Sequence, residues 1–97
     1  MQEQHFLAVP AEMTIANIGQ CQVILMSALR TVCEVCFDLA GLRKIDTAGI
    51  QLLLLVIREA KQRGVSINWL NKNTVLQEAE KKLGFENRLI TPLGTMI

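Results

Sequence analysis

The chain has 97 residues, of which 51% are hydrophobic, and its ten Lys and Arg nearly balance nine Asp and Glu. This length supports one core, so we expect a single domain over residues 1–97, with a loosely ordered tail at about 91–97. A net charge of +1, with only three Phe and one Trp, argues against a nucleic-acid binder, which needs a basic face or a base-stacking platform.

The N-terminal residues and the hydropathy predict a cytoplasmic protein. Residues 1–5 contain neither the basic segment nor the apolar segment of a signal peptide. The longest apolar run, 52–57, is much shorter than the roughly 20 residues that cross a membrane. Three cysteines, an odd number, fit a reducing compartment better than a disulfide scaffold. We therefore expect no direct insertion into a membrane.

The first half of the chain predicts a helix between two strands. Residues 5–9 predict a short strand, and residues 14–29 predict a helix because apolar side chains recur there at helical spacing. Gly19 weakens the first half of this helix. Residues 32–39 predict a second strand. Alternation places three apolar side chains on one face of that strand, namely Val35, Phe37 and Leu39.

The second half begins with a predicted loop at 40–45. Residues 48–63 predict a long helix, which ends at Gly64 after two cations in its last turn. Residues 65–70 then predict a third strand. This order continues the alternation of strands and helices, which is typical of an α/β domain with at least partly parallel strands.

A third helix follows, and two residues compete to cap it. Either Asn73 or Thr74 could accept the first free backbone N–H groups, and Gly84 ends the helix. Residues 85–90 predict a last short strand or a helical turn. The chain contains no repeat and no internal linker, so these elements belong to one unit.

The cysteines and the single histidine are candidates for redox, metal-binding or catalytic roles. Cys33 and Cys36 have the C-x-x-C spacing of thiol redox enzymes, but they lie in a predicted strand, whose alternation points them to opposite faces. A zinc site would also require Cys21 and His5 to converge with them. His5 has no evident acid or nucleophile partner. We expect no metal, no cofactor and no catalytic residue, and therefore no enzyme.

The junction Asp46-Thr47-Ala48-Gly49, at the start of the long helix, is the best candidate site. The N-terminal backbone N–H groups of a helix are unpaired and carry partial positive charge. A phosphate on Thr47 would add about two negative charges to a nearly neutral surface, which suits a phosphorylation switch. Thr47 could equally be an ordinary helix cap, a task that Asp46 could share. The residues alone leave both interpretations open.

The helix after this junction is unusually apolar. Residues 50–57 are hydrophobic around most of the helix circumference, which is more than one buried stripe requires. One interpretation is a helix covered on both sides by its own domain. The other is that part of its surface, together with the loop at 40–47, binds a partner protein.

Residues 37–50, Phe-Asp-Leu-Ala-Gly-Leu-Arg-Lys-Ile-Asp-Thr-Ala-Gly-Ile, resemble the signature of the STAS family, the anti-sigma factor antagonists. That signature is a strand ending in Asp-Leu, a short loop, then apolar-Asp-Ser/Thr-x-Gly-apolar and a Leu-rich helix. The similarity continues through 58–64 and into the next strand and helix. Upstream, Glu12-Met13-Thr14 is similar to the Glu-Leu-Thr that precedes the first helix of the family. The resemblance to this family implies an α/β fold of the STAS type, with a small mixed β-sheet and helices packed on one side.

The resemblance also implies a function without catalysis. Its Ser/Thr phosphoacceptor falls on Thr47, which a serine-kinase anti-sigma factor binds and phosphorylates and a PP2C-type phosphatase resets. The dephosphorylated form frees a sigma factor and so regulates transcription in bacteria. The implied partner-binding residues are Asp46, Thr47, Ala48, Gly49, Ile50 and Leu53.

Two positions depart from the antagonists. Ala48 stands where many members carry a second Ser, and Ala11 stands where Gly often precedes the Glu. Thr-Ala-Gly also resembles the small STAS subunit of the bacterial phospholipid-trafficking ABC transporter. In that subunit the matching Thr contacts the ATPase without needing phosphorylation. The alternative function is therefore an accessory subunit that braces the ATPase of a lipid transporter.

Overall fold

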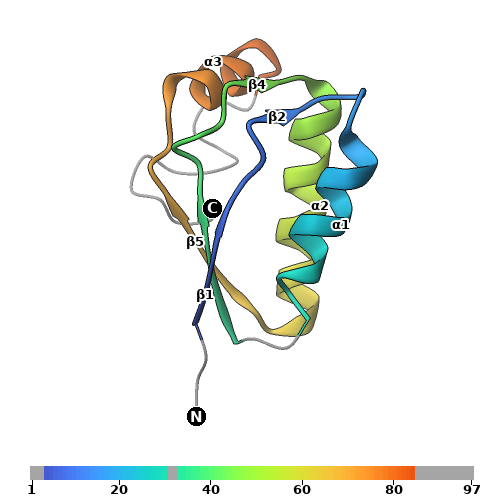
Figure 1. Ribbon diagram of the computed structural model, residues 1–97, viewed down its shortest axis with the longest axis vertical. Coiled ribbons are helices and arrows are strands. Elements are labelled where there is room, and N and C mark those ends of the chain that lie inside the picture. Colours follow the sequence, from blue (N-terminus) through green and yellow to red (C-terminus); the bar gives the residue numbers. More distant parts are fainter. Residues whose placement is uncertain (1–3, 31–32, 85–97) are drawn as a thin grey trace.

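The computed structural model describes residues 4–30 and 33–84 (Figure 1). Its elements in chain order are β1 (Gln4–Ala8), β2 (Glu12–Met13), α1 (Ile18–Ser27), β3 (Glu34–Asp38), β4 (Lys44–Ile45), α2 (Thr47–Arg63), β5 (Ser66–Leu70) and α3 (Thr74–Lys82). The strand or turn expected at 85–90 and the tail expected at 91–97 lie outside the described residues.

Two small parallel sheets organise the described part of the chain. The larger sheet has the strand order β1-β3-β5, and β2 pairs with β4 in the smaller one. Figure 1 shows α1 and α2 side by side on one side of the larger sheet, with α3 near β4 at the end of the molecule where the strands finish. The predicted α/β class, with helices on one side, is confirmed, and every pairing in the described residues is parallel.

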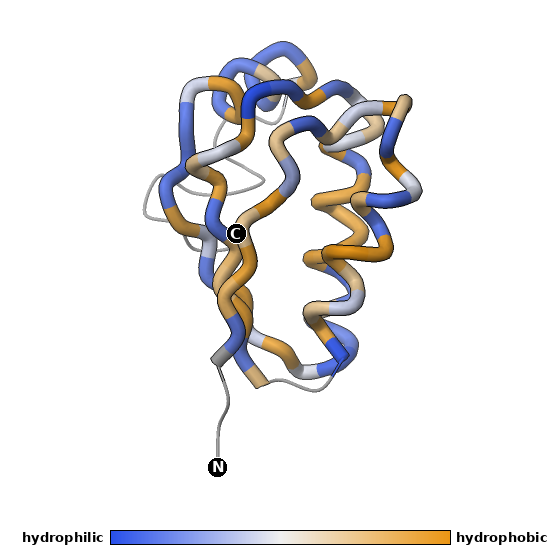
Figure 2. Tube along the Cα trace, viewed as in Figure 1, coloured by the Kyte–Doolittle hydropathy of each residue, from blue (hydrophilic) through white to orange (hydrophobic). Residues whose placement is uncertain are grey.

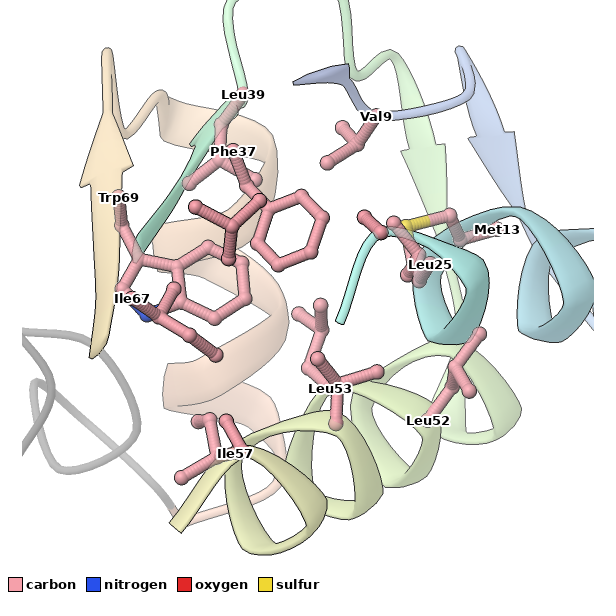
Figure 3. Packing of buried hydrophobic residues seen from close by; sticks show 14 of the residues in the cluster. Val9, Met13, Leu25, Phe37, Leu39, Leu52, Leu53, Ile57, Ile67 and Trp69 are labelled. Carbon is pink, nitrogen blue, oxygen red and sulfur yellow. The ribbon is translucent and has the colours of Figure 1, made fainter. Parts of the chain in front are cut away.

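The core fills the space between the larger sheet and the two long helices (Figure 3). Phe37 and Trp69 lie opposite each other in the register of β3 and β5, with ring centroids 5.1 Å apart. Leu53 of α2 points from the helix into this space. Figure 2 shows hydrophobic residues recurring along the strands and along α2, as the sequence pattern predicts.

The first helix is shorter than predicted. Residues 14–17 form a turn, and α1 begins only at Ile18. The Asn17 side chain explains the difference, because its amide oxygen accepts the Thr14 N–H at 2.9 Å and its amide nitrogen donates to the Glu12 carbonyl at 2.7 Å. Asn side chains that bond to nearby backbone favour turns over helix. The helical periodicity of the sequence therefore predicted the start of this helix four residues too early.

The loop predicted at 40–45 contains a strand that the sequence did not predict. Its last two residues form β4, which pairs in parallel with β2, through Glu12 opposite Lys44 and Met13 opposite Ile45. A two-residue strand has no readable alternation, so only the tertiary structure reveals it. The pair matters for the site because it leads directly into the N-terminus of α2.

Helix α2 follows its prediction closely. It ends at Gly64, whose φ of 71° is the left-handed conformation that glycine adopts most easily. Most of its apolar run is buried, whereas Leu54 and Leu55 are each 38% exposed. Within the described residues, no helix is long and apolar enough to cross a membrane. The domain therefore covers most of the helix circumference and leaves two leucines exposed, while partner binding by this exposed part stays a prediction.

The three cysteines occupy separate positions. Cys33 is exposed and precedes β3, so it does not lie in the strand as predicted, whereas Cys36 is buried within it. Cys21 is buried in α1, and burial raises the pKa of its thiol. None of the three forms a disulfide. In the described ranges, no three His, Cys, Asp or Glu side chains are grouped as metal ligands.

Candidate functional site

The candidate site lies where β4 passes into α2. Asp46 is the single residue between the two elements, and Thr47 is the first residue of the helix. Figure 1 shows this junction at the end of the molecule where α3 also lies. In parallel α/β sheets, binding sites form beyond the carboxyl ends of the strands, which is where this junction is placed.

Asp46 caps α2 and also holds the preceding loop in place. One carboxylate oxygen accepts the Gly49 N–H at 3.2 Å, and the other accepts the Ile15 N–H at 3.0 Å. The hydrogen bond from Ile15 is the main cause that lowers the pKa of Asp46 below its usual value. The side chain is therefore a carboxylate at neutral pH. It joins the start of α2 to the turn that precedes α1.

Thr47 is exposed at the first position of α2, where the sequence predicted it. Because Asp46 supplies the cap, Thr47 is not needed for that task, and the interpretation of Thr47 as the cap is set aside. The hydroxyl of Thr47 stands on the surface beside a negative carboxylate. It is free to make a contact or to accept a phosphoryl group.

Gly49 is required by close packing rather than by its backbone angles. A Cβ added there would collide with the carbonyl oxygen of Met13 and would lie 2.5 Å from Cγ1 of Ile45. The first turn of α2 therefore rests directly on the β2–β4 pair. This contact fixes the position of the first turn of α2, and with it the position of Thr47, relative to the β2–β4 pair.

The six residues assigned to the partner surface divide into two groups. Asp46, Thr47 and Ala48 are exposed or half-buried. Gly49 is buried, as are Ile50, which is 1% exposed, and Leu53, which is 0% exposed. On α2 these three face the sheet side, because positions three and four apart share one face of a helix. Their side chains pack into the core, so the surface available to a partner is narrower than the sequence suggested.

A hollow opens beside Thr47 between the β4–α2 junction and α3. It has a volume of about 420 Å³. Its lining residues are Arg43, Ile45, Asp46, Thr47, Val75, Glu78, Ala79, Lys82 and Leu83. Four of them carry charge, two of each sign, around aliphatic side chains. The α3 wall was missed from sequence, since nothing local indicates that α3 lies against β4.

Asn73 holds that wall in position. Its amide oxygen accepts the Leu76 N–H and caps α3, while its amide nitrogen donates to the carbonyls of Leu39 at 3.1 Å and Leu42 at 2.9 Å. The choice between Asn73 and Thr74 as cap is therefore settled for Asn73. One side chain fixes both the start of α3 and the loop that leads to Arg43. The geometry of the hollow depends on it.

A second hollow lies on the open face of α2 and has a volume of about 680 Å³. Its lining residues are Gln51, Leu54, Leu55, Ile57, Arg58, Lys61 and Gln62. Here too aliphatic and cationic side chains alternate. This surface extends the candidate interface along α2, and four of its residues, Gln51, Leu54, Leu55 and Ile57, belong to the apolar run 50–57 whose surface was proposed from the sequence to bind a partner.

Comparisons with known proteins agree with this fold. A family model described as the STAS domain matches residues 2–93. A solved structure, described as that of a sulfate transporter family protein from Wolinella succinogenes, is similar with a TM-score of 0.69 and 15% identity. The similarity covers 89% of this chain and 70% of that one. At this identity the likeness concerns the fold alone. No curated protein matches the chain.

Proposed function

Because this chain belongs to the STAS family, we propose that it is a non-catalytic protein-interaction switch of the anti-sigma factor antagonist kind. In this proposal, phosphorylation at Thr47 controls binding to a serine-kinase anti-sigma factor in the cytoplasm, and a PP2C-type phosphatase reverses it. The family match supports the class of protein. The local structure around Thr47 supports the choice of this residue as the phosphorylation site.

The observation that carries the proposal is that Asp46, and not Thr47, caps α2. Asp46 caps the helix, which leaves an exposed threonine hydroxyl without a structural task. In the reaction, Thr47 Oγ attacks the γ-phosphorus of ATP bound to the kinase. The Oγ–P bond forms as the bond to the departing ADP oxygen breaks, and the hydroxyl proton passes to a base of the kinase.

Binding of a candidate serine-kinase partner to Thr47→Ala and Thr47→Glu chains tests the proposal. We expect the Ala chain to bind like wild type and the Glu chain to bind at least about tenfold more weakly, because a new carboxylate beside Asp46 must be desolvated on docking. Thr74→Glu is the matched control, since Thr74 is also an exposed first residue behind a capping side chain. Full-strength binding by Thr47→Glu would contradict the charge switch.

One observation favours the accessory-subunit alternative. The Gly49 N–H already donates to Asp46, so a phosphate on Thr47 would not gain this hydrogen-bond donor. An unmodified Thr47 hydroxyl does not need a backbone donor. In a subunit that braces the ATPase of a lipid transporter, Thr47 itself would contact the partner. Thr47→Ala would then weaken assembly with the ATPase, which is opposite to its expected effect in the switch. The same two variants therefore separate the two functions.

A further inference from the structure

The hollow beside Thr47 has two cationic side chains at its wall, one from each side. We propose that a phosphate on Thr47 turns into this hollow and is held there by Arg43 and Lys82, so that the modified residue fills the hollow. The inference rests on the proposed phosphorylation of Thr47 and adds how it acts. Phosphorylation thereby fills the hollow from within the domain, in addition to placing charge on the surface beside it.

The N-terminus of α2 is poorly suited to bind this phosphate. Phosphates at helix starts are normally held by unpaired N–H groups of the first turn. In this chain the Asp46 carboxylate accepts the Gly49 N–H and lies next to Thr47. A phosphate left at the helix start would meet a like charge and would gain little from the helix. Its counter-charges must come from another element.

Arg43 and Lys82 are placed to supply those charges. Both are exposed, both line the hollow with Thr47, and within residues 4–30 and 33–84 neither forms an ion pair. They come from opposite walls, because Arg43 directly precedes β4 and Lys82 is the last residue of α3. A phosphate carries close to two negative charges and three acceptor oxygens at neutral pH, so it can pair with both cations at once.

Glu78 is the opposing charge. It lines the same hollow four residues before Lys82, on the same face of α3, yet it is not within ion-pair distance of Lys82. The hollow is thus electrically balanced before phosphorylation, with two cations and two carboxylates. The phosphate, with about twice the charge of Glu78, has the stronger attraction for Lys82. Removing the Glu78 carboxylate should tighten the capture.

The consequence for binding follows from what the phosphate covers. The aliphatic part of the lining of the hollow includes Ile45, Val75 and Leu83. In the unmodified chain a partner side chain can bury this aliphatic lining, whereas the captured phosphate and its two cations occupy the hollow. The partner must then displace a paired dianion, which costs far more than displacing water.

The test uses the full chain with phosphothreonine genetically encoded at position 47, so it needs neither a kinase nor a partner. Phosphorus NMR follows the second ionisation of the phosphate. In the Arg43→Gln, Lys82→Gln double variant, that pKa should lie roughly 0.5 to 1 unit above the wild-type value, because two counter-charges are lost. In Glu78→Gln it should lie below the wild-type value.

Lys44→Gln with Lys81→Gln is the matched control. These lysines are exposed, are the sequence neighbours of Arg43 and Lys82, and do not line the hollow. The control loses the same charge and should shift the pKa much less. Equal shifts in the two double variants would overturn the capture, because only long-range charge would then act. Neither result bears on whether a kinase modifies Thr47, so the proposed function stands or falls separately.

Discussion

At the scale of single residues, Gly49 shows most directly how packing overrides helix propensity. Replacing a helical glycine by alanine normally stabilises a protein by up to about 1 kcal/mol. Gly49→Ala should instead destabilise the chain, since the new methyl group collides with the Met13 carbonyl and Ile45. Gly19→Ala in α1 is the control, because nothing lies within 4 Å of the added atom. Urea unfolding of both variants should give opposite signs, and a stabilised Gly49→Ala chain would show that the contact is not tight.

Asp46 also makes the stability depend on acid. Its pKa is lowered in the folded state, chiefly by the Ile15 N–H, so the ionised form favours folding. That contribution is complete above the unfolded-state pKa of about 3.9, and it is lost as the pH falls through the lower folded-state value. Asp46→Asn keeps a capping side chain but should lose less stability than wild type between about pH 5 and pH 2.

Urea midpoints measured across that range check the acid prediction. Glu59→Gln is the control, because Glu59 pairs with Arg63 on the exposed side of α2 and such a pair contributes only a few tenths of a kcal/mol. Asp38 should behave like Asp46, since hydrogen bonds from Asn71 and from the Ala40 N–H lower its pKa. An Asp46→Asn chain that loses stability in acid as steeply as wild type would contradict the assignment.

At the scale of elements, prediction from sequence succeeded where a pattern was long enough to be read. The apolar run and the glycine stop located α2 to within a residue, and alternation located the buried face of β3. It failed for β2 and β4, which are two residues long and exist only because each meets the other. It also extended α1 through 14–17, where the Asn17 side chain diverts the backbone into a turn.

The cap of α3 gives an element-scale prediction. Asn73→Ala removes the hydrogen bond to the Leu76 N–H and the donor to the Leu42 carbonyl, whereas the Leu39 carbonyl still accepts the Leu42 N–H at 3.1 Å. We expect a loss of about 2–3 kcal/mol in unfolding free energy, from the lost cap together with the Leu42 carbonyl that is left without this donor. Thr74→Ala, one residue later and exposed, should change it by less than about 0.5 kcal/mol. Chemical denaturation measures both, and similar losses would return the capping role to Thr74.

At the scale of the whole molecule, the site was only half predictable. The sequence located Asp46 and Thr47 because they follow one another at a helix start. It could not locate Arg43 opposite Lys82, because that meeting depends on α3 packing against β4. It also could not show that the Asp46 carboxylate reaches Ile15, which lies 31 residues earlier. Nor did it indicate that Lys72 and Glu80 form a buried ion pair at 2.7 Å.

Phosphorylation of Thr47 should leave the whole domain folded. Thr47 is exposed, and the core contacts of α2 come from residues on its other face. The phosphate adds repulsion from Asp46, which is worth about 1 kcal/mol between charges about 4 Å apart in water, and it gains attraction from Arg43 and Lys82. These terms have opposite signs and similar size. For a chain of this length, the midpoint of thermal unfolding should therefore shift by less than about 5 °C.

Calorimetry on the phosphothreonine chain and the unmodified chain measures this shift. Raising the salt to about 1 M shortens the screening length to about 3 Å, so the two midpoints should converge. Far-ultraviolet circular dichroism should show equal helix content in both chains. A midpoint lowered by more than about 10 °C, or a loss of helical signal, would mean that Thr47 supports the fold itself. A switch residue has to change what the domain binds while the domain stays folded.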